Sequence, residues 1–242
     1  MLRGVSKRHG AGRAGVVALD GVSLTVRRGE FVCLVGASGC GKTTLLSLAA
    51  GLDRASAGTL EVNGRTALMF QESALLPWRT AVQNVELALK LGGVPRRQRR
   101  PEALELLRSV HLSDFADKMP HELSGGMRQR VALARALAQR ADILLMDEPF
   151  GALDAITRDV LHDELERVVQ ERGLTVLFVT HNVREASRLG DRIVLLSSRP
   201  GRVVAEFDVP VERPRRIESP DVSAIAATVT ARLREEVRRH AH

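Results

Sequence analysis

Cysteine, tyrosine and tryptophan are scarce in this sequence. Its 242 residues include two cysteines, one tryptophan and no tyrosine. Two cysteines, Cys33 and Cys40, cannot form the disulfide framework of a small secreted domain, and their spacing matches no zinc-binding pattern. Long apolar runs are missing as well: no stretch of about 18 apolar residues occurs, and the first residues lack the apolar core of a signal peptide. We therefore expect a protein of a reducing cytosol that works at a membrane only through a partner.

Lysine is also rare, although the chain is basic. Lysine and arginine together number 36 against 29 acidic residues, which gives a formal charge of +7, and only four of the 36 are lysines. A positive charge of this size is compatible with binding to nucleic acid or to an anionic membrane. The arginines, however, stand in short separated runs at 96–100 and 213–216, a pattern typical of solvated loops. We therefore expect no nucleic-acid partner.

Short apolar runs of strand length alternate with helical patterns along the chain. This alternation predicts an α/β fold with a mainly parallel sheet. Four of the runs end in a polar group. They are Glu30–Val35 before GASGCGKTT, Ala67–Phe70 before Gln71, Ile143–Met146 before Asp147, and Thr175–Thr180 before His181. Because ligands of open parallel sheets lie outside the carboxyl ends of the strands, we expect these polar groups to converge on one site.

The segment after the first run matches the pattern G-x-x-x-x-G-K-[ST] and opens a helix predicted from Thr43 to about residue 50. Backbone N–H groups in such a loop surround phosphate oxygens, while Lys42 reaches the β- and γ-phosphates and Thr43 binds Mg²⁺. An ordinary glycine-rich turn would not require the lysine and threonine. Cys40 is expected to be a small filler residue. The predicted nucleotide-binding residues are Gly36, Ala37, Ser38, Gly39, Cys40, Gly41, Lys42, Thr43 and Thr44.

The other three polar groups have predicted roles in hydrolysis. Asp147 follows a buried strand and is expected to hold the Mg²⁺ shell, with Glu148 beside it as the base or water-positioning group. Gln71 is a candidate for contact with Mg²⁺ or the attacking water, and His181 for a hydrogen bond to the γ-phosphate. Taken singly, Gln71 is equally typical of a surface residue and His181 of a structural histidine.

These residues resemble the ATP-binding cassette (ABC) ATPases, whose motifs occur here in the order found in that family. The matching segments are GASGCGKTT, the Gln71 loop, LSGGMRQR at Leu123–Arg130, ILLMDEP at Ile143–Pro149, GALD at Gly151–Asp154 and VTHN around His181. The resemblance covers roughly residues 5–204. It implies a P-loop NTPase fold with an N-terminal antiparallel β subdomain and an inserted α-helical subdomain, and it implies that ATP and Mg²⁺ bind.

In this family, two nucleotide-binding domains pair head to tail, and the signature segment of one covers the ATP of the other. The resemblance implies that Ser124, Gly125 and Gly126 contact the γ-phosphate of a partner's ATP. It also places Asp154 in the D-loop, which crosses the dimer interface. The residues alone predict a simpler and compatible role: Ser124 and Asp154 each cap the helix that follows them.

The predicted organisation is an ATPase domain over 1–210, with a helical subdomain inserted at about 75–139, and a linker with an amphipathic helix over 211–242. Within the subdomain, Pro101 is placed to start a helix. In the last segment, apolar residues recur at helical spacing and predict a helix that packs on the domain. They are Val222, Ile225, Ala226, Val229, Leu233 and Val237.

A long amphipathic helix is predicted to follow Asp154 and to end at Gly173. Six apolar residues are expected to face inward from it. They are Ile156, Val160, Leu161, Leu165, Val168 and Val169.

Two further residues are candidates because of the resemblance. Trp78 lies where the family receives a coupling helix of its membrane subunit, and a buried core tryptophan is an equal alternative. His9 stands near the position of the aromatic residue on which the family stacks adenine, and an exposed loop histidine is an equal alternative. The segment 10–15 after it predicts a mobile loop. We expect weaker discrimination between nucleobases than an aromatic residue would give.

Longer strings such as LLPWRTAVQNV, MDEPFGALDAITR and SSRPGRVV resemble the nitrate/sulfonate/taurine importer branch. This implies an ATPase at the cytoplasmic face of the membrane that energises import of a small anion or organosulfur compound. The expected partners are a second nucleotide-binding subunit (an identical chain or a paralogue), integral membrane permease subunits and, indirectly, a periplasmic or lipid-anchored solute-binding protein.

Two other functions are alternatives to transport. An ABC-type ATPase acting on nucleic acid or ribosomes is suggested by the charge, but such relatives carry inserted coiled coils or two cassettes. A P-loop small-molecule kinase would have no use for the segment LSGG.

Overall fold

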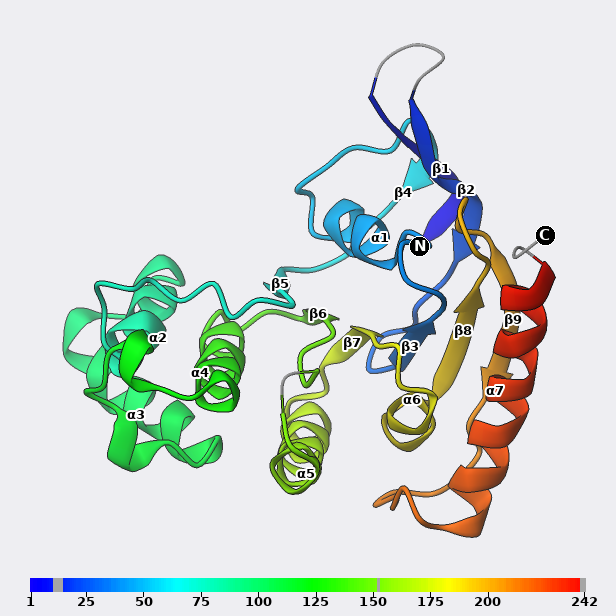
Figure 1. Ribbon diagram of the computed structural model, residues 1–242. Helices are drawn as coiled ribbons and strands as arrows, with labels where there is room; N and C mark the ends of the chain where they lie inside the picture. Colours follow the sequence, from blue (N-terminus) through cyan, green and yellow to red (C-terminus); the bar gives the residue numbers. More distant parts are fainter. Residues whose placement is uncertain (11–14, 152, 240–242) are drawn as a thin grey trace. The chain divides into compact units, whose positions relative to one another are not determined.

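The computed structural model describes residues 1–10, 15–151 and 153–239, and the chain divides into two compact units. One unit comprises Met1–Gly64 and Gly173–His242, and the other comprises Arg65–Arg172. The ends of the sequence thus build the first unit and its middle builds the second (Figure 1). None of the helices in the described ranges combines the length and the apolar character that a membrane span requires.

β3 (Phe31–Val35) lies at the centre of a buried sheet in the first unit. It pairs in parallel with β7 (Thr175–Val179) on one side and with β8 (Arg192–Leu196) on the other. β9 (Val203–Asp208) continues the sheet antiparallel to β8. All residues of β3 and β7 are buried, and for this reason both strands are continuous apolar runs without alternation.

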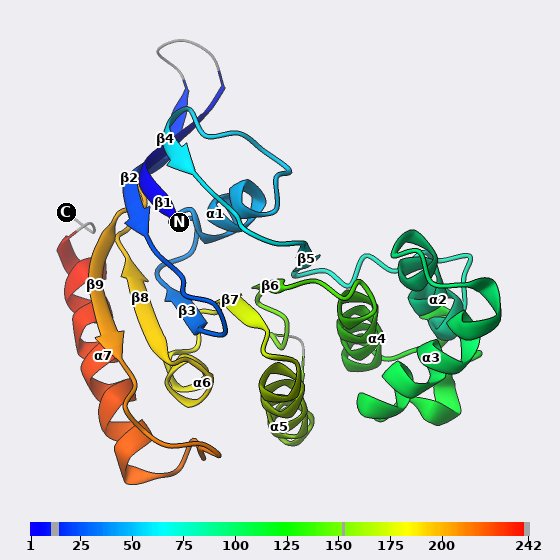
Figure 2. The ribbon, with the colours of Figure 1, turned by 180° about the vertical axis from the view of Figure 1, so that it is seen from behind.

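A three-stranded antiparallel sheet in the order β2-β1-β4 forms the N-terminal part of the first unit, as predicted. Its strands are β1 (Leu2–His9), β2 (Val16–Leu24) and β4 (Ala57–Leu60). The helices of this unit are α1 (Lys42–Ala49), α6 (Val183–Leu189) and α7 (Pro220–Arg239). α7 packs against α6 and runs beside β9 in both ribbon views (Figures 1 and 2).

The buried face of α7 differs from the predicted one at its end. Val222, Ala226 and Val229 are buried as expected, but Val237 is 44% exposed and Glu236 is buried. The reason is the helical period: residue 236 lies 14 positions, almost four turns, after residue 222 and points within about 40° of it, whereas residue 237 points about 60° away on the other side of the helix.

Over its described residues, 65–151 and 153–172, the second unit contains one parallel strand pair and four α-helices. β5 (Thr66–Met69) pairs with β6 (Ile143–Asp147). The helices are α2 (Ala81–Leu91), α3 (Arg96–Ser109), α4 (Gly125–Leu137) and α5 (Ala155–Arg172). α2, α3 and α4 pack on one another. Two 3₁₀ turns, Ser113–Phe115 and Pro120–Glu122, connect α3 to α4.

α3 begins earlier than the sequence predicts. Pro95 is its N-cap, Arg96 is its first residue, and Pro101 lies inside the helix. The predictions of a solvated loop at 96–100 and of a helix start at Pro101 are therefore wrong. Pro101 is exposed, so the hydrogen bond that its ring nitrogen cannot donate is lost on the solvent side, where water can bind the remaining carbonyl.

α5 has the predicted bounds but only part of the predicted buried face. Four of its six apolar residues are buried, whereas Ile156 is 79% exposed and Val160 is 42% exposed. His162 and Glu166 are buried instead, and the His162 ring packs edge-on against Phe150 with 5.2 Å between the centroids. The first turns of α5 thus do not pack on the core of their own unit.

Candidate functional site

The phosphate loop connects β3 to α1 and curls tightly. Gly39 and Gly41 have φ angles of 73° and 103°, in the left-handed region that side chains disfavour. A Cβ on Gly36 would lie 2.8 Å from Cys40 Sγ, and a Cβ on Gly41 would lie 2.7 Å from Ala18 O. Glycine is therefore required at these three positions. A curled loop of this kind presents successive backbone N–H groups to an anion.

Lys42 adds a positive charge to the loop. It is 6% exposed, and its Nζ donates hydrogen bonds to Gly36 O at 2.8 Å and to Ala37 O at 2.9 Å. No side chain among the described residues caps the N-terminus of α1, and its first turn has no acidic residue. The terminal N–H groups and the positive end of the helix dipole therefore remain for a ligand, and a phosphate group fits this environment.

The two cysteines are free and buried. Cys40 fills the space inside the phosphate loop next to Gly36. Burial raises the pKa of the Cys33 thiol well above its usual value, and the nearby Glu185 carboxylate raises it further. A protonated, buried thiol is a poor nucleophile and a poor metal ligand, so Cys33 serves as a core residue.

The turn between β8 and β9, in the segment SSRPGR, supports the phosphate loop. Gly201 is hydrogen-bonded to β2 through its N–H at 2.9 Å and its carbonyl at 3.0 Å. A Cβ on Gly201 would lie only 2.1 Å from Cys40 O. Arg199 Nε donates to Gly39 O at 3.2 Å. This contact was not predicted from the sequence, where the segment only resembles the importer branch, because no local pattern shows that residues 160 positions apart meet.

Gly201→Ala is expected to displace this turn or the phosphate loop, because the added Cβ meets a backbone carbonyl. We expect the free energy of unfolding to fall by about 1–3 kcal/mol and ATP binding to weaken. Thermal unfolding and nucleotide titration of the purified chain measure the two effects. Gly92→Ala is the matched control, since Gly92 has a φ of −75° and the nearest atom to its added Cβ is 3.4 Å away. Unchanged stability and ATP affinity in Gly201→Ala would show that the turn does not support the loop.

Two predicted histidines lie in the same unit as the phosphate loop. His181 is exposed and follows β7, directly before the N-cap of α6. His9 is exposed at the end of β1, and its Nε2 lies 3.5 Å from Thr44 Oγ1. His9 is thus adjacent to the helix that follows the phosphate loop. Residues 11–14, in the predicted mobile loop, lie outside the described residues.

Asp147 and Glu148 occupy a strand end and a strained turn in the second unit. Asp147 is the last residue of β6 and is 5% exposed. Glu148 has a φ of 44°, which is unusual for a residue with a side chain. A conformation of this kind costs on the order of 1–3 kcal/mol and occurs preferentially at functional sites. The backbone outlier is thus consistent with the role that the motif assigns to Glu148.

The signature segment begins α4. Ser124 Oγ accepts a hydrogen bond from Met127 N at 3.2 Å, and the helix starts at Gly125, so the predicted N-cap is confirmed. Ser124 itself is exposed. A Cβ on Gly126 would lie 2.8 Å from the Leu153 side chain. The second glycine of the signature is thus packed against the segment GALD that precedes α5.

Asp154 in that segment caps α5, as the residues predict. Its Oδ1 accepts a hydrogen bond from Thr157 N at 2.9 Å. This bond lowers the pKa of the Asp154 carboxyl below its usual value. The helix ends before Gly173, which has a φ of 60°.

Two side chains of α4 hold the Gln71 loop, and the sequence analysis missed both contacts. The Gln71 side chain is exposed, while its backbone oxygen accepts a hydrogen bond from Gln129 Nε2. Arg135 donates to Ala74 O at 2.6 Å and to Ser73 O at 2.8 Å. Burial lowers the pKa of the Arg135 guanidinium. The signal available in the sequence was a glutamine three and four positions before Ala132 and Leu133, on an apolar face of α4, and Gln129 is 6% exposed in the structure.

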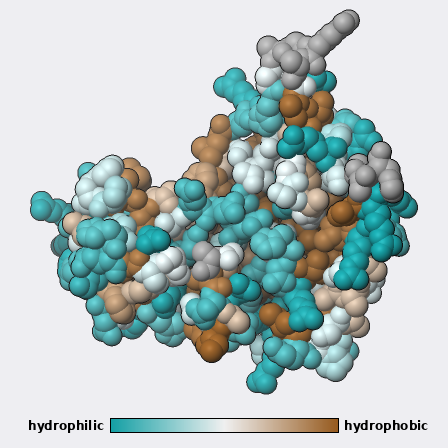
Figure 3. Space-filling model, in the orientation of Figure 1, coloured by the Kyte–Doolittle hydropathy of each residue, from teal (hydrophilic) through white to brown (hydrophobic). Residues whose placement is uncertain are grey.

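Trp78 is 68% exposed, so the alternative of a buried core tryptophan is wrong. Hydrophilic residues cover much of the face shown in Figure 3. Asn84 has no exposed surface and lies against the loop at 76–80, which contains Trp78. Its side chain accepts from Leu76 N at 2.8 Å and donates to Arg79 O at 3.1 Å and Thr80 O at 3.0 Å. Hydrogen bonds from the buried Asn84 side chain therefore hold the backbone of this loop in place.

Comparison with known proteins identifies the family. A family model described as ABC transporter matches residues 19–151, more than half of the chain. The chain belongs to the ABC transporter family. This ABC protein is 48% identical over 236 residues to the taurine import ATP-binding protein TauB of Rhizobium johnstonii, and the match covers 94% of this chain and 90% of the relative. It is 46% identical over 237 residues to the aliphatic sulfonates import ATP-binding protein SsuB 1 of Mesorhizobium japonicum, with 96% and 87% covered.

Solved structures support the same assignment. One is described as the dimeric, post-hydrolysis state of the ATP-binding cassette MJ0796 bound to ADP and Pi. It matches with a TM-score of 0.78 and 35% identity, over 87% of this chain and 99% of that one. The predicted P-loop NTPase fold is thereby confirmed. Members of the ABC transporter family hydrolyse ATP to power transport, and this ABC protein is an ATPase.

Proposed function

We propose that this ABC ATPase energises a binding-protein-dependent importer of a small anion or organosulfur compound such as nitrate, a sulfonate or taurine. The ATPase part of this proposal rests on the phosphate loop, which requires glycine at three positions and in which Lys42 donates a hydrogen bond to a loop carbonyl. The relatives named above as import proteins for taurine and aliphatic sulfonates support the substrate class. They do not favour the alternative of an ATPase that acts on nucleic acid or ribosomes.

The nucleotide-binding roles that we propose rest on the loop chemistry and, for His9, on the resemblance to the family. We assign the triphosphate to the backbone of residues 36–44, with Lys42 neutralising phosphate charge, and adenine to the vicinity of His9. Thr43, Gln71 and Asp147 are the residues assigned to Mg²⁺, since hydroxyl, amide and carboxylate oxygens are the hard donors that this ion prefers. The ion would neutralise charge on the β- and γ-phosphate oxygens.

Hydrolysis is assigned to three side chains. The Glu148 carboxylate accepts a proton from water as the water oxygen attacks the γ-phosphorus, and the bond to the ADP oxygen breaks. The Gln71 amide orients the water, and the His181 ring hydrogen-bonds the γ-phosphate. The left-handed backbone of Glu148 supports a catalytic position for this residue.

The signature segment requires a partner chain in this proposal. Ser124, Gly125, Gly126 and Asp154 act on the ATP held by the second nucleotide-binding subunit, either an identical chain or a paralogue. A head-to-tail pair uses both segments of each chain and forms two equivalent sites, which gives an isologous two-fold dimer. Its closure excludes water and moves the permease at the cytoplasmic face of the membrane, and hydrolysis reopens it.

We assign the loop around Trp78 to the contact with the permease. The Trp78 side chain is exposed, and Asn84 holds the backbone of the loop in place. Trp78→Ala is expected to reduce co-purification with the permease. It is also expected to lower the ATPase stimulation by solute-loaded binding protein about 10-fold or more, as large aromatic residues dominate interface energy. Leu52→Ala, at an apolar residue that is 63% exposed in the other unit, is the matched control.

Full ATPase stimulation of the Trp78→Ala complex would show that this loop does not contact the permease. Salt-dependent binding of the chain to RNA or DNA at physiological ionic strength, without solute-dependent stimulation in the membrane complex, would instead support the nucleic-acid alternative.

A further inference from the structure

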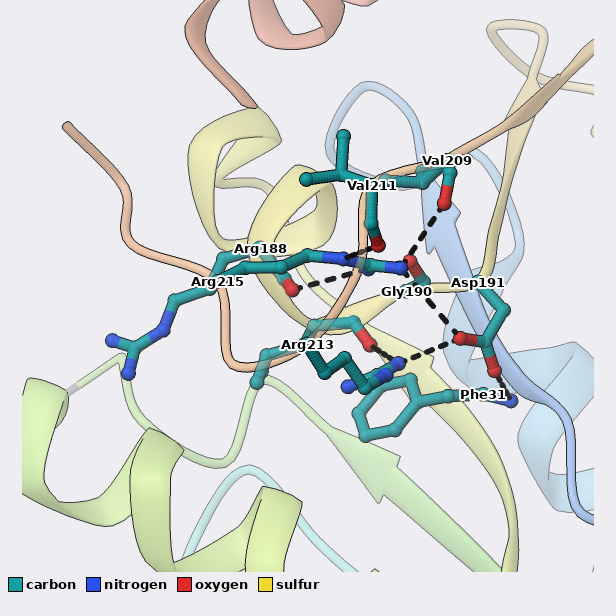
Figure 4. A network of polar contacts seen from close by, with 9 residues as sticks. Phe31, Arg188, Gly190, Asp191, Val209, Val211, Arg213 and Arg215 are labelled. Carbon is teal, nitrogen blue, oxygen red and sulfur yellow. Dashed lines mark hydrogen bonds and ion pairs between the residues drawn. The ribbon is translucent and has the colours of Figure 1, made fainter. Parts of the chain in front are cut away.

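Hydrogen bonds from a buried arginine connect the segment after β9 to the end of α6 (Figure 4). Arg215 is 5% exposed, so the prediction of a solvated loop at 213–216 is wrong for this residue. Its guanidinium donates hydrogen bonds to the carbonyl oxygens of Arg188 at 3.3 Å, Gly190 at 2.5 Å, Val209 at 3.0 Å and Val211 at 2.7 Å. Two of these carbonyls belong to the end of α6 and two to the C-terminal segment. One side chain thus joins both.

Arg213 makes a second connection at the same place. It donates to Leu189 O at 2.5 Å and to Asp191 Oδ1 at 2.7 Å. The other carboxylate oxygen of Asp191 accepts from Phe31 N at 2.9 Å, and the Arg213 guanidinium lies 5.9 Å from the Phe31 ring centroid. Figure 4 shows these groups facing one another. The C-terminal segment, the end of α6 and the first residue of β3 therefore form one network.

α6 is so short that contacts at its C-terminal end contribute strongly to its stability and position. The helix has seven residues, about two turns, and helices of this length are unstable without tertiary contacts. Three of the carbonyls that the two arginines bind, those of Arg188, Leu189 and Gly190, lie at the negative end of the helix dipole. Burying a guanidinium has a desolvation cost, which a specific set of hydrogen bonds offsets. The network therefore fixes where this helix end lies.

The opposite end of α6 adjoins His181. Thr180 is 2% exposed, its hydroxyl donates to the Glu185 carboxylate, and it accepts from Asn182 N at 3.0 Å. Asn182 caps α6 by accepting from the N–H groups at 184 and 185. Thr180 N also bonds to Leu34 O, next to the phosphate loop, at 3.2 Å. His181 thus lies between two residues that are both bonded to the first turn of α6.

We propose that Arg213 and Arg215 are positioning residues for ATP hydrolysis, which hold the C-terminal end of α6 and through it place His181 for the γ-phosphate. This inference rests on the role assigned to His181 above. It gives the segment that leads to α7 a part in turnover in addition to packing. Neither arginine contacts the nucleotide in this account.

A double-mutant cycle on the full chain tests the inference. Arg215→Met is expected to lower kcat for ATP about 10-fold or more, with KM changed less than about 2-fold, because misplacing a reacting group affects the rate more than ground-state binding. In the His181→Ala background, the same change is expected to alter kcat by less than about 2-fold. Single-turnover assays keep slow variants measurable. Arg216→Met, at the exposed neighbouring arginine, is the matched control and should retain the parental kcat.

The outcomes separate the inference from the function on which it rests. Equal losses in both backgrounds, or parental kcat in Arg215→Met, overturn the positioning role. If Arg215→Met does not fold, Arg213→Gln, which leaves the Arg215 hydrogen bonds in place, is judged by the same criteria. Parental kcat in His181→Ala alone shows that the assigned function of His181 is wrong, and the positioning role is overturned with it.

Discussion

Glu148→Gln is expected to bind ATP, form an ATP-dependent dimer and almost stop turning over. The amide cannot accept the proton of the attacking water, so the hydrolysis rate should fall by about 10²–10⁴-fold. Glutamine has nearly the same size and can keep the left-handed backbone seen at this position, so the phosphate loop and the fold should be unaffected. Sedimentation with and without MgATP measures the dimer, and phosphate release measures the turnover.

Glu105→Gln is the matched control for this substitution. Glu105 is an exposed carboxylate of α3 that pairs with Arg108, and its loss should change neither the dimer nor the rate. If Glu148→Gln hydrolyses ATP at the parental rate, the assignment of Glu148 is wrong. If Glu148→Gln is inactive and stays monomeric with ATP, Glu148 acts in hydrolysis, but this variant gives no evidence for an ATP-dependent dimer.

Ser124→Arg is expected to separate nucleotide binding from hydrolysis. The phosphate loop is unchanged in this variant, so ATP binding by the isolated chain should stay near parental. Dimer closure and turnover should fail, because a long cationic side chain replaces the small hydroxyl where the signature meets the partner's ATP. Loss of the N-cap of α4 should also lower stability by about 1 kcal/mol. Nucleotide titration, sedimentation and phosphate release measure these effects.

Two companion variants distinguish the cap from the interface. Ser124→Ala removes the hydrogen bond to Met127 without adding bulk, and it should lose stability but retain part of the turnover. Ser124→Thr keeps the cap and should remain close to parental. Parental turnover in Ser124→Arg would show that the signature does not meet a nucleotide.

The strand ends were predictable because their signals are local. The strands β3 and β6 end within about a residue of the predicted places, since a buried strand must be an apolar run and the next polar group marks its end. The glycines of the phosphate loop were equally predictable, because each has a conformation or a contact that excludes a side chain. The caps at Ser124 and Asp154 followed from residue type alone.

The remaining features depend on contacts between distant residues. Arg199 and Gly201 meet the phosphate loop about 160 positions away, and Arg213 and Arg215 act on carbonyls, which have no sequence signature. Ile156 is exposed although it fits the helical stripe, because its own unit does not extend over the first turn of α5.

We propose that the segment at Ser124 is half of a nucleotide site and that the phosphate loop of a second chain supplies the other half. Mixing two inactive variants tests it most directly. Lys42→Ala lacks a working phosphate loop, and Ser124→Arg lacks a working signature, so a mixed head-to-tail dimer contains one site with both halves intact. We predict that the mixture recovers part of the parental ATP hydrolysis that neither variant shows alone. A mixture as inactive as its separate components would contradict the claim.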